Sequence, residues 1–328
     1  MDISSSLVSA VIPTRHRPAL VLRAVRSALG QTYPNLEVVV VIDGPDQATE
    51  IALRSVDDGR LRVIALTEGV GGSDARNTGV QAARGEWIAF LDDDDEWLPR
   101  KLELQLAAAM RSPARFPVVA CRIVGRTSQG DCIWPQRMLT GGEAIAEYLF
   151  NRHGLGPREG QLITSMIVAR RELLFAVPFA SGLRRHQDTD WYLRAGRYPG
   201  LRFEMLPEVL AVVHIAERRP SIQNSHDWRW SLNWLRERRG LMSRRAYAGF
   251  IATQLAPEAI AQGDRRAFYV LLREAVLRGR LSALETLIYL GAWLMPAGLR
   301  RTLRVRLSRR PTGVSNPSLA NIIAALPD

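Results

Sequence analysis

Four consecutive aspartates, Asp92–Asp95, form the most unusual chemical feature of the sequence, within the segment FLDDDDEWLP. They follow an apolar run directly and are followed closely by Trp97 and Pro99, so they do not belong to a long polar loop. Adjacent carboxylates repel one another, and a hard divalent cation would relieve that repulsion. Mg²⁺ binds through only one or two carboxylates and takes other ligands from phosphate oxygens. The run therefore predicts a metal–diphosphate site, with a solvated acidic turn as the alternative.

The aspartates follow a predicted strand in a chain that alternates strands with helices. Short apolar, β-branched runs predict the strands, and apolar residues spaced near 3.6 predict the helices. In the first third, strands are predicted at 7–13, 36–44, 61–66 and 86–91, and helices at 18–29, 47–55, 73–85 and from 99 onward. This alternation predicts an α/β fold with a doubly wound, mainly parallel sheet. Ligands of such sheets bind outside the carboxyl ends of the strands, where the aspartates fall.

The rest of the chain is less regular and ends in helices. Strands are predicted at 118–124, 162–168 and 203–213, and helices at 142–150 and 188–195. After about residue 225 only helices are predicted, at 228–239, 244–255, 265–278 and 282–294, separated by Gly and Pro. A C-terminal helical region therefore begins between residues 215 and 225.

The charge of the chain changes at the same place. The net charge is +11; residues 1–214 carry 25 basic and 25 acidic side chains, whereas residues 215–328 carry 19 and 8. A basic end on a neutral front part is typical of contact with an anionic membrane surface or with nucleic acid. Cys121 and Cys132 lack metal-type spacing, which favours a reduced cytosolic protein and leaves one disulfide possible. The N-terminus lacks the features of a signal peptide.

Several motifs in succession resemble family-2 glycosyltransferases with the glycosyltransferase-A fold. They are VSAVIPTRHRP, QTYPNLEVVVVIDG and DARNTGVQAARGEWIAFLDDDDEWLP, and the resemblance covers residues 8 to about 104. It implies an inverting, metal-dependent transferase that uses Mg²⁺ or Mn²⁺ and a nucleoside-diphosphate sugar, with UDP or dTDP as the nucleotide. The acceptor would be a glycan or lipid-linked hydroxyl in cell-surface polysaccharide synthesis. The domains implied are 1–220 for catalysis, with a nucleotide-binding half (1–104) and an acceptor half (105–220), and 221–328 for the basic helical region.

The resemblance also assigns residues to the donor site. Asp43 is similar to the acid that accepts the N3–H of uracil or thymine, because a carboxylate accepts and does not donate. Asp94 is similar to the metal ligand, and His214 is a second candidate ligand because neutral imidazole binds divalent ions. The nucleotide site implied as a whole consists of Pro13, Thr14, Arg15, Asp43, Arg76, Asn77, Asp92 and Asp93.

A second motif, LRRHQDTDWYLRAG at 183–196, supplies the acceptor side. It resembles the segment that carries the catalytic base of inverting family-2 enzymes, and Asp188 stands at the position of the base. Gln187 replaces the Glu that is frequent there, and Asp188 as a helix cap is the alternative. The residues implied near the donor sugar or acceptor are Asp95, Trp97, His186, Gln187 and Trp191, although both Trp side chains also fit core packing.

The basic end suggests where the protein works. Residues 286–310 combine an apolar stretch with six arginines, a pattern typical of a helix lying in a membrane interface. This predicts a cytoplasmic protein, peripheral on the inner face of the plasma membrane, with a solvated basic face as the alternative. Two other functions fit parts of the sequence: a sugar-phosphate nucleotidyltransferase and an Arg-rich nucleic-acid-binding protein. Nucleic acid is disfavoured because no recognition motif accompanies the charge.

Overall fold

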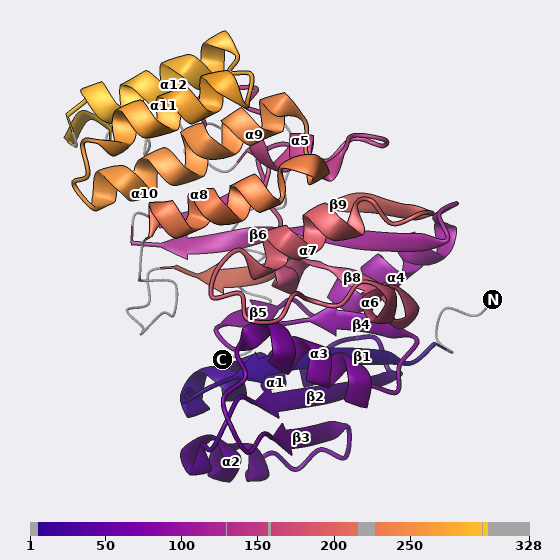
Figure 1. Cartoon of the computed structure of the whole chain (residues 1–328). Helices are drawn as coiled ribbons and strands as arrows, with labels where there is room; N and C mark the ends of the chain where they lie inside the picture. The colour runs from indigo at the N-terminus through magenta and orange to yellow at the C-terminus, as the bar shows by residue number, and fades with distance from the viewer. Residues whose placement is uncertain (1–5, 129, 157–158, 216–226, 297, 301–328) are drawn as a thin grey trace.

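The protein is one large sheet covered by helices, with a separate helical layer along one end (Figure 1). The computed structural model describes residues 6–128, 130–156, 159–215, 227–296 and 298–300. Nine strands of the described chain form the sheet in the order β3-β2-β1-β4-β8-β6-β9-β5, and β7 pairs with β6.

The first half is the predicted parallel α/β unit. Its strands are β1 (Val8–Thr14), β2 (Leu36–Ile42), β3 (Leu61–Ala65) and β4 (Trp87–Phe90). Its helices are α1 (Pro18–Leu29), α2 (Gln47–Arg54) and α3 (Gly72–Ala82). All seven residues of β2 are buried, as expected for a β-branched strand covered on both faces. Pro18 opens α1, where its missing N–H has no helical acceptor to lose.

The strand order reverses between β1 and β4. The chain runs outward from β1 through β2 to the edge strand β3, then returns to the far side of β1 to form β4. Right-handed crossovers in opposite directions place α1 and α3 on opposite faces of the sheet. The carboxyl ends of β1 and β4 thus flank the switch point, where open α/β sheets bind ligands. The acidic run follows β4 directly.

The second half makes the sheet mixed. Its strands are β5 (Asp95–Trp97), β6 (Phe116–Thr127), β7 (Gly130–Trp134), β8 (Val168–Arg170) and β9 (Leu201–His214). β6 and β9 are parallel, whereas β5, β7 and β8 pair antiparallel with their neighbours. The predicted strand at 162–168 is largely wrong, because Thr164–Met166 forms a 3-10 turn and the strand begins only at Val168.

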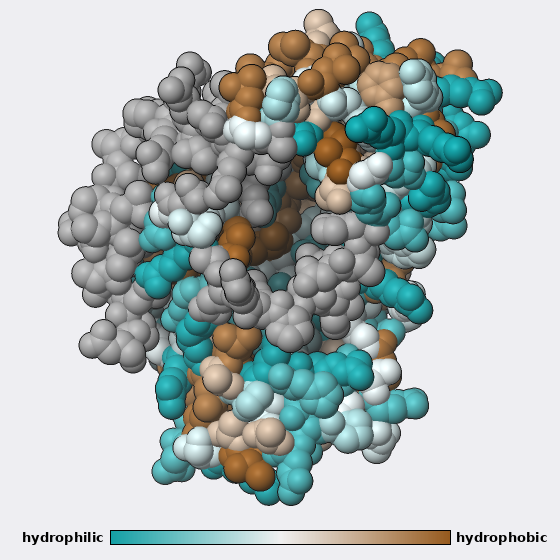
Figure 2. All heavy atoms as spheres, turned by 90° about the vertical axis from the view of Figure 1, so that its left-hand side faces the viewer, coloured by the Kyte–Doolittle hydropathy of each residue, from teal (hydrophilic) through white to brown (hydrophobic). Residues whose placement is uncertain are grey.

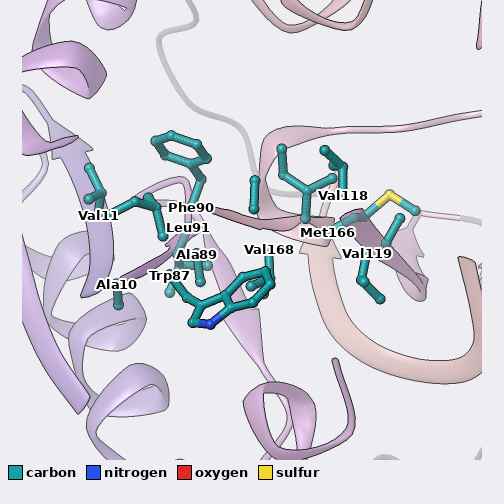
Figure 3. Close-up of a cluster of buried hydrophobic side chains, with 14 of the residues drawn as sticks. Ala10, Val11, Trp87, Ala89, Phe90, Leu91, Val118, Val119, Met166 and Val168 are labelled. Atoms are coloured by element: carbon teal, nitrogen blue, oxygen red, sulfur yellow. The ribbon is translucent and has the colours of Figure 1, made fainter. Parts of the chain in front are cut away.

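Buried apolar side chains from β1, β4, β6 and β8 join the two halves in one core. Trp87 and Phe90 of β4 lie beside Val11 of β1 and Val168 of β8 (Figure 3). The helices that flank the second half are α4 (Lys101–Arg111), α5 (Ile145–Phe150), α6 (Arg171–Ala176) and α7 (Gln187–Ala195).

The C-terminal part is helical, as predicted. Its elements are α8 (Trp228–Glu237), a 3-10 turn (Arg239–Leu241), α9 (Arg244–Phe250), a π-helical segment (Ile251–Leu255), α10 (Ala256–Ala261), α11 (Ala267–Leu277) and α12 (Ala283–Leu294). The π-helical segment precedes Pro257, which has no N–H to donate to the preceding turn.

This helical layer shares a core with the catalytic half, since Phe150 and Leu193 pack within its apolar cluster. The predicted domain boundary at 220/221 lies in residues 216–226, outside the described residues, and stays a prediction. Residues 301–310 of the predicted membrane segment also lie outside them. Within the described chain, no helix combines the length and apolar content needed to cross a bilayer.

Lys101 is the only lysine of the chain, and it is fully buried at the start of α4. Its ammonium group donates to Gln105 Oε1 at 2.6 Å and lies 4.4 Å from the ring centre of Trp97. Burial lowers the pKa of Lys101 from 10.5 to about 8, because the interior disfavours the charged form. The neutral form therefore suits this site better than the charged form does.

Lys101→Met should change how stability depends on pH. Between pH 8 and 10.5 the unfolded wild-type chain holds more protons on this residue than the folded chain, so its free energy of unfolding rises with pH. The full rise is roughly 3 kcal/mol. Urea denaturation across this range should give the wild type the more positive slope of stability against pH by this amount, because the other titrating groups are the same in both proteins. Equal slopes in both proteins would contradict the depressed pKa.

Gly79→Ala tests the contact between α3 and the sheet. A Cβ at Gly79 would lie 2.3 Å from Val11 Cγ1 and 3.3 Å from Val41 Cγ2, so the helix would have to move away. Helix propensity alone would favour Ala by about 1 kcal/mol, but overpacking costs about 1–3 kcal/mol. We expect a lower urea midpoint. Gly59→Ala is the matched control, because a Cβ there meets nothing within 4 Å; equal midpoints for both variants would contradict the close contact.

Candidate active site

The acidic run forms a turn, in which the N–H of Asp95 donates to Asp92 O at 3.1 Å, and its carboxylates differ in burial. Asp93 accepts from Thr14 Oγ1 at 2.7 Å and from Arg17 Nη1 at 2.9 Å, so it lies beneath the loop. The side chain of Asp93 is 7% exposed, against 29% for Asp92 and 17% for Asp94. Burial raises the pKa of Asp93, although Arg17 and Thr14 oppose the shift. The implied role of Asp93 in nucleotide contact is therefore corrected to a structural one.

Arg17 is a site residue that the sequence analysis missed. Its guanidinium binds both Asp93 and Asp94, the latter at 3.2 Å. Burial alone would lower the pKa of Arg17, but the three neighbouring aspartates raise it above its ordinary value. The repulsion within the acidic run is thus partly offset by a cation of the protein itself. The signal available in the sequence was the second arginine of TRHRP, which faces the run across the switch point.

Arg76 of α3 connects the acidic run with the segment around Asp188. It is buried and donates to Asp92 Oδ1 at 2.5 Å and to Gln187 Oε1 at 3.0 Å. Burial would lower the pKa of Arg76, but Asp92 and Asp188 raise it above its ordinary value. Gln187 Nε2 donates to Leu183 O, so both ends of this amide make contacts within the protein, and its predicted sugar contact stays a prediction.

Asp188 lies in the first turn of α7 and faces the acidic run. Burial raises its pKa above the ordinary value, the nearby Asp92 raises it further, and Arg76 opposes them. The N-termini of α3 and α7 lie close together here. Gly72 and Gln187 are the first residues of these helices, and a Cβ at Gly72 would lie 2.9 Å from Gln187 Oε1. Helix N-termini stabilise anions through their N–H groups and dipoles. The arrangement thus places the Asp188 carboxylate beside two helix N-termini.

The C-terminal helices fix α7 from its other side. Asp190 is fully buried and accepts from Arg194 Nε at 2.6 Å, Arg238 Nε at 2.8 Å and Trp234 Nε1 at 3.3 Å. His186, which precedes α7 with a left-handed φ of 60°, lies 2.8 Å from Ser231 Oγ. Its ring packs against Trp234, and burial lowers its pKa to about 3. The ring of His186 thus faces α8, and its predicted position near the acceptor stays a prediction.

Asp43 and Arg15 lie at the far side of the switch point. Asp43 Oδ1 accepts from the N–H of Val70 at 2.6 Å, and both of its carboxylate oxygens lie 3.1 Å from the N–H of Gly71. Arg15 Nη1 lies 3.8 Å from Asp43 Oδ2. Asp43 therefore holds the loop that leads into α3, beside the half-buried Pro13. Its implied contact with the base stays a prediction.

Asn77 and two tryptophans make contacts within the protein. Asn77 uses both ends of its amide on the backbone of Phe179, with each hydrogen bond 2.9 Å long, and its implied contact with the nucleotide stays a prediction. Trp97 is buried and donates to Ser165 O, and Trp191 is buried and donates to Val177 O. Neither indole ring presents a face to a sugar.

Thr164 and Ser165 shape the acidic run, and no sequence motif marked them. Ser165 Oγ accepts from the N–H of Asp92 at 3.1 Å and donates to Asp95 Oδ2 at 2.6 Å. Thr164 Oγ1 donates to Asp92 at 3.2 Å. Asp95 is buried, so its predicted contact with the donor sugar is corrected to this internal hydrogen bond.

The carboxylates fit a cation that shares its ligands with phosphate. Among the described residues, no three His, Cys, Asp or Glu side chains form a complete metal site. Asp92 and Asp94 are the members of the run that remain partly exposed, and Mg²⁺ needs only one or two carboxylates when phosphate completes its shell. His214 Nε2 lies 2.5 Å from Glu96 Oε1, so any ligand role of His214 falls to Nδ1, with Glu96 as its orienting carboxylate.

Comparison with known proteins identifies the family. The family described as "Glycosyl transferase family 2" matches residues 9–176. The amylovoran biosynthesis glycosyltransferase AmsB of Erwinia amylovora is 30% identical over 252 residues, which are 74% of this chain and 80% of AmsB. The UDP-Glc:alpha-D-GlcNAc-diphosphoundecaprenol beta-1,3-glucosyltransferase WfgD of Escherichia coli is 31% identical over 133 residues, 40% of this chain and 53% of WfgD.

The fold agrees with this match. The mannosyltransferase PcManGT of Pyrobaculum calidifontis, solved with GDP-Man and Mn²⁺, has a TM-score of 0.55 at 19% identity, over 98% of this chain and 87% of that protein. The matched family residues include the switch point, the acidic run and Arg76. The chain therefore belongs to glycosyltransferase family 2 and has the glycosyltransferase-A fold.

Proposed function

We propose that the protein is an inverting, metal-dependent glycosyltransferase of cell-surface polysaccharide synthesis. It transfers a sugar from a nucleoside-diphosphate sugar, with UDP or dTDP as the nucleotide, to a hydroxyl of a glycan or lipid-linked acceptor. The observation that carries the proposal is the buried Arg76, which holds Asp92 of the acidic run beside Gln187 and Asp188. The name of WfgD supports a UDP-sugar donor and a lipid-diphosphate acceptor. A lipid-linked acceptor would place the protein on the cytoplasmic face of the plasma membrane.

Asp188 is the proposed catalytic base. The acceptor hydroxyl gives its proton to the Asp188 carboxylate as its oxygen attacks the anomeric carbon, and the bond to the diphosphate breaks on the opposite face. A single displacement inverts the anomeric configuration. Burial raises the pKa of Asp188, which makes the carboxylate a stronger base than a solvated aspartate.

The leaving group gains negative charge in the same step. This charge grows on the nucleoside diphosphate as its bond to the sugar breaks, and preorganised hydrogen-bond donors aimed at the charge lower the barrier. The first turns of α3 and α7 present N–H groups toward this region. Asp94 would hold Mg²⁺ or Mn²⁺, and the further candidate ligands are Asp92 and Nδ1 of His214. Such an ion supplies Lewis-acid stabilisation of the leaving diphosphate when bound. PcManGT with Mn²⁺ supports the choice of a divalent cation.

Asp188→Asn tests the base. Turnover should fall about 100- to 10,000-fold, while affinity for the nucleotide sugar, measured by calorimetry, stays within a few-fold. In the wild type, kcat/KM should fall as pH is lowered through a pKa above that of a solvated aspartate.

Because the folded state holds the Asp188 proton more tightly than the unfolded state, ionisation of Asp188 destabilises the fold at neutral pH. The variant should therefore unfold at a higher temperature at pH 7. The exposed Asp57→Asn serves as control; lost donor binding with retained turnover of bound donor would refute the assignment.

A thermal-shift panel of nucleoside diphosphates with and without Mn²⁺ tests donor and metal together. UDP or dTDP should stabilise the wild type more than GDP, and Mn²⁺ should increase the shift, since ligands that bind only the folded state raise its stability. Asp94→Asn should abolish the Mn²⁺-dependent part. Its neighbour Asp93→Asn should keep that part, because Asp93 faces Thr14 and Arg17. If Asp94→Asn leaves the Mn²⁺-dependent shift intact, the metal assignment is wrong.

A further inference from the structure

The outermost helices present an apolar face to solvent. Tyr269 and Leu277 of α11 are 75% and 62% exposed, and Leu287 and Leu294 of α12 are 58% and 74% exposed. Figure 2 shows apolar side chains gathered along the top of the molecule, where Figure 1 places α11 and α12. Single exposed apolar residues are ordinary, but a group of them on adjacent helices marks an interaction site.

Helical spacing places these residues on one side of each helix. Tyr269 and Val276 are seven residues apart in α11, and Leu287 and Leu294 are seven apart in α12, so each pair lies two turns apart on one face. The only charged residue of α12 is Glu285, which is fully buried and completes the capping box at the start of the helix. The outward face of α12 is therefore uncharged.

Exposed arginines border this face without acidic partners. They are Arg265, Arg266, Arg273 and Arg280, and none forms an ion pair with a carboxylate of the described chain. The acidic residues between 256 and 300 are all engaged, in the pairs Glu258–Arg185, Asp264–Arg229, Glu274–Arg236 and Glu285–Arg245. The face thus combines exposed apolar side chains with uncompensated positive charge.

We propose that this face, formed by the outward residues of α11 and α12 with the four arginines, docks on the surface of an anionic lipid bilayer. Apolar side chains flanked by arginines are what a monolayer of acyl chains under anionic headgroups binds. The inference rests on the proposed function, because a lipid-linked acceptor requires the enzyme to work at a membrane. It also extends the surface predicted at 286–310 to α11, which lies upstream of that segment.

The charge pattern favours lipid over the other occupants of such a face. Two copies of the chain packed face to face would bring arginines together with no acidic residue of that face between them, which is destabilising. Nucleic acid would pair with the arginines, but phosphate contacts would leave the exposed leucines in water. Only a bilayer uses both the charge and the apolar surface.

Vesicle sedimentation tests the proposal with the full chain. The wild type should bind phosphatidylglycerol-containing vesicles and release at high salt, while vesicles of phosphatidylcholine alone bind it weakly. Arg266→Gln, Arg273→Gln and Arg280→Gln together should weaken binding about 100-fold, taking about 1 kcal/mol for each arginine and 1.4 kcal/mol for each tenfold change.

Matched controls lie at the other exposed surfaces. The triple variant Arg54→Gln, Arg100→Gln and Arg115→Gln removes the same charge from side chains that are 75%, 62% and 73% exposed, and it should bind nearly as the wild type does. Leu294→Gln should weaken binding, and Ile51→Gln on α2 should not. Equal binding by the two triple variants would overturn the assignment. All of these variants should bind the nucleotide sugar with unchanged affinity. A wild type that binds no nucleotide sugar would instead refute the proposed function.

A fluorophore at Leu287→Cys, with Cys132→Ser to remove the competing thiol, distinguishes the occupants. Its emission should shift to the blue when anionic vesicles are added. A shift that follows protein concentration without lipid would show that a second copy covers the face. Emission that is blue from the start and unchanged by lipid would show that another segment of the same chain covers it. Either of these outcomes would overturn the proposal.

Discussion

One buried guanidinium holds the two halves of the active site in register. Arg76 comes from α3 in the first half of the chain and contacts both the acidic run, through Asp92, and the start of α7, through Gln187. A charged group removed from water is tolerated only where it is paired, so this position requires the carboxylates around it. Asp92 lies close enough to Asp188 to raise the pKa of Asp188 further, and Arg76 opposes that shift. The acidic run and the start of α7 are thereby assembled around a single positive charge.

The acidic run is stable for a related reason. Its residues form a turn, in which the N–H of Asp95 donates to Asp92 O, and protein groups balance or hold the carboxylates. Arg17 pairs with Asp93 and Asp94, Arg76 pairs with Asp92, and Ser165 holds Asp95 at the start of β5. Asp92 and Asp94 are more exposed than Asp93. A phosphate-bound divalent ion uses one or two carboxylates, which is the number proposed for this site.

The C-terminal helices contribute to the site through α7. Asp190 and His186 attach the helix to α8, so the segment bearing the proposed base is fixed from both sides. This connection explains the helical layer better than the nucleic-acid alternative does, and membership of glycosyltransferase family 2 excludes both that alternative and the nucleotidyltransferase one. A bilayer bound at α11 and α12 would contact the helical layer that shares an apolar core with α7.

The sequence by itself determined the parallel half of the sheet, the position of the acidic run and the family, because apolar periodicity and contiguous motifs are local properties. It did not reveal β5 inside the acidic segment, since a three-residue strand that begins at Asp95 forms only because β9 offers an antiparallel partner. Nor did it show that Asp93 pairs with Arg17 and Thr14, that Asn77 and His186 contact Phe179 and Ser231, or that both tryptophans are buried. Those roles depend on partners far away in the chain, such as Phe179 for Asn77 and Ser231 for His186. Only the tertiary structure decides such contacts, because the side chain's type fixes what it can bind and the fold fixes what lies within reach.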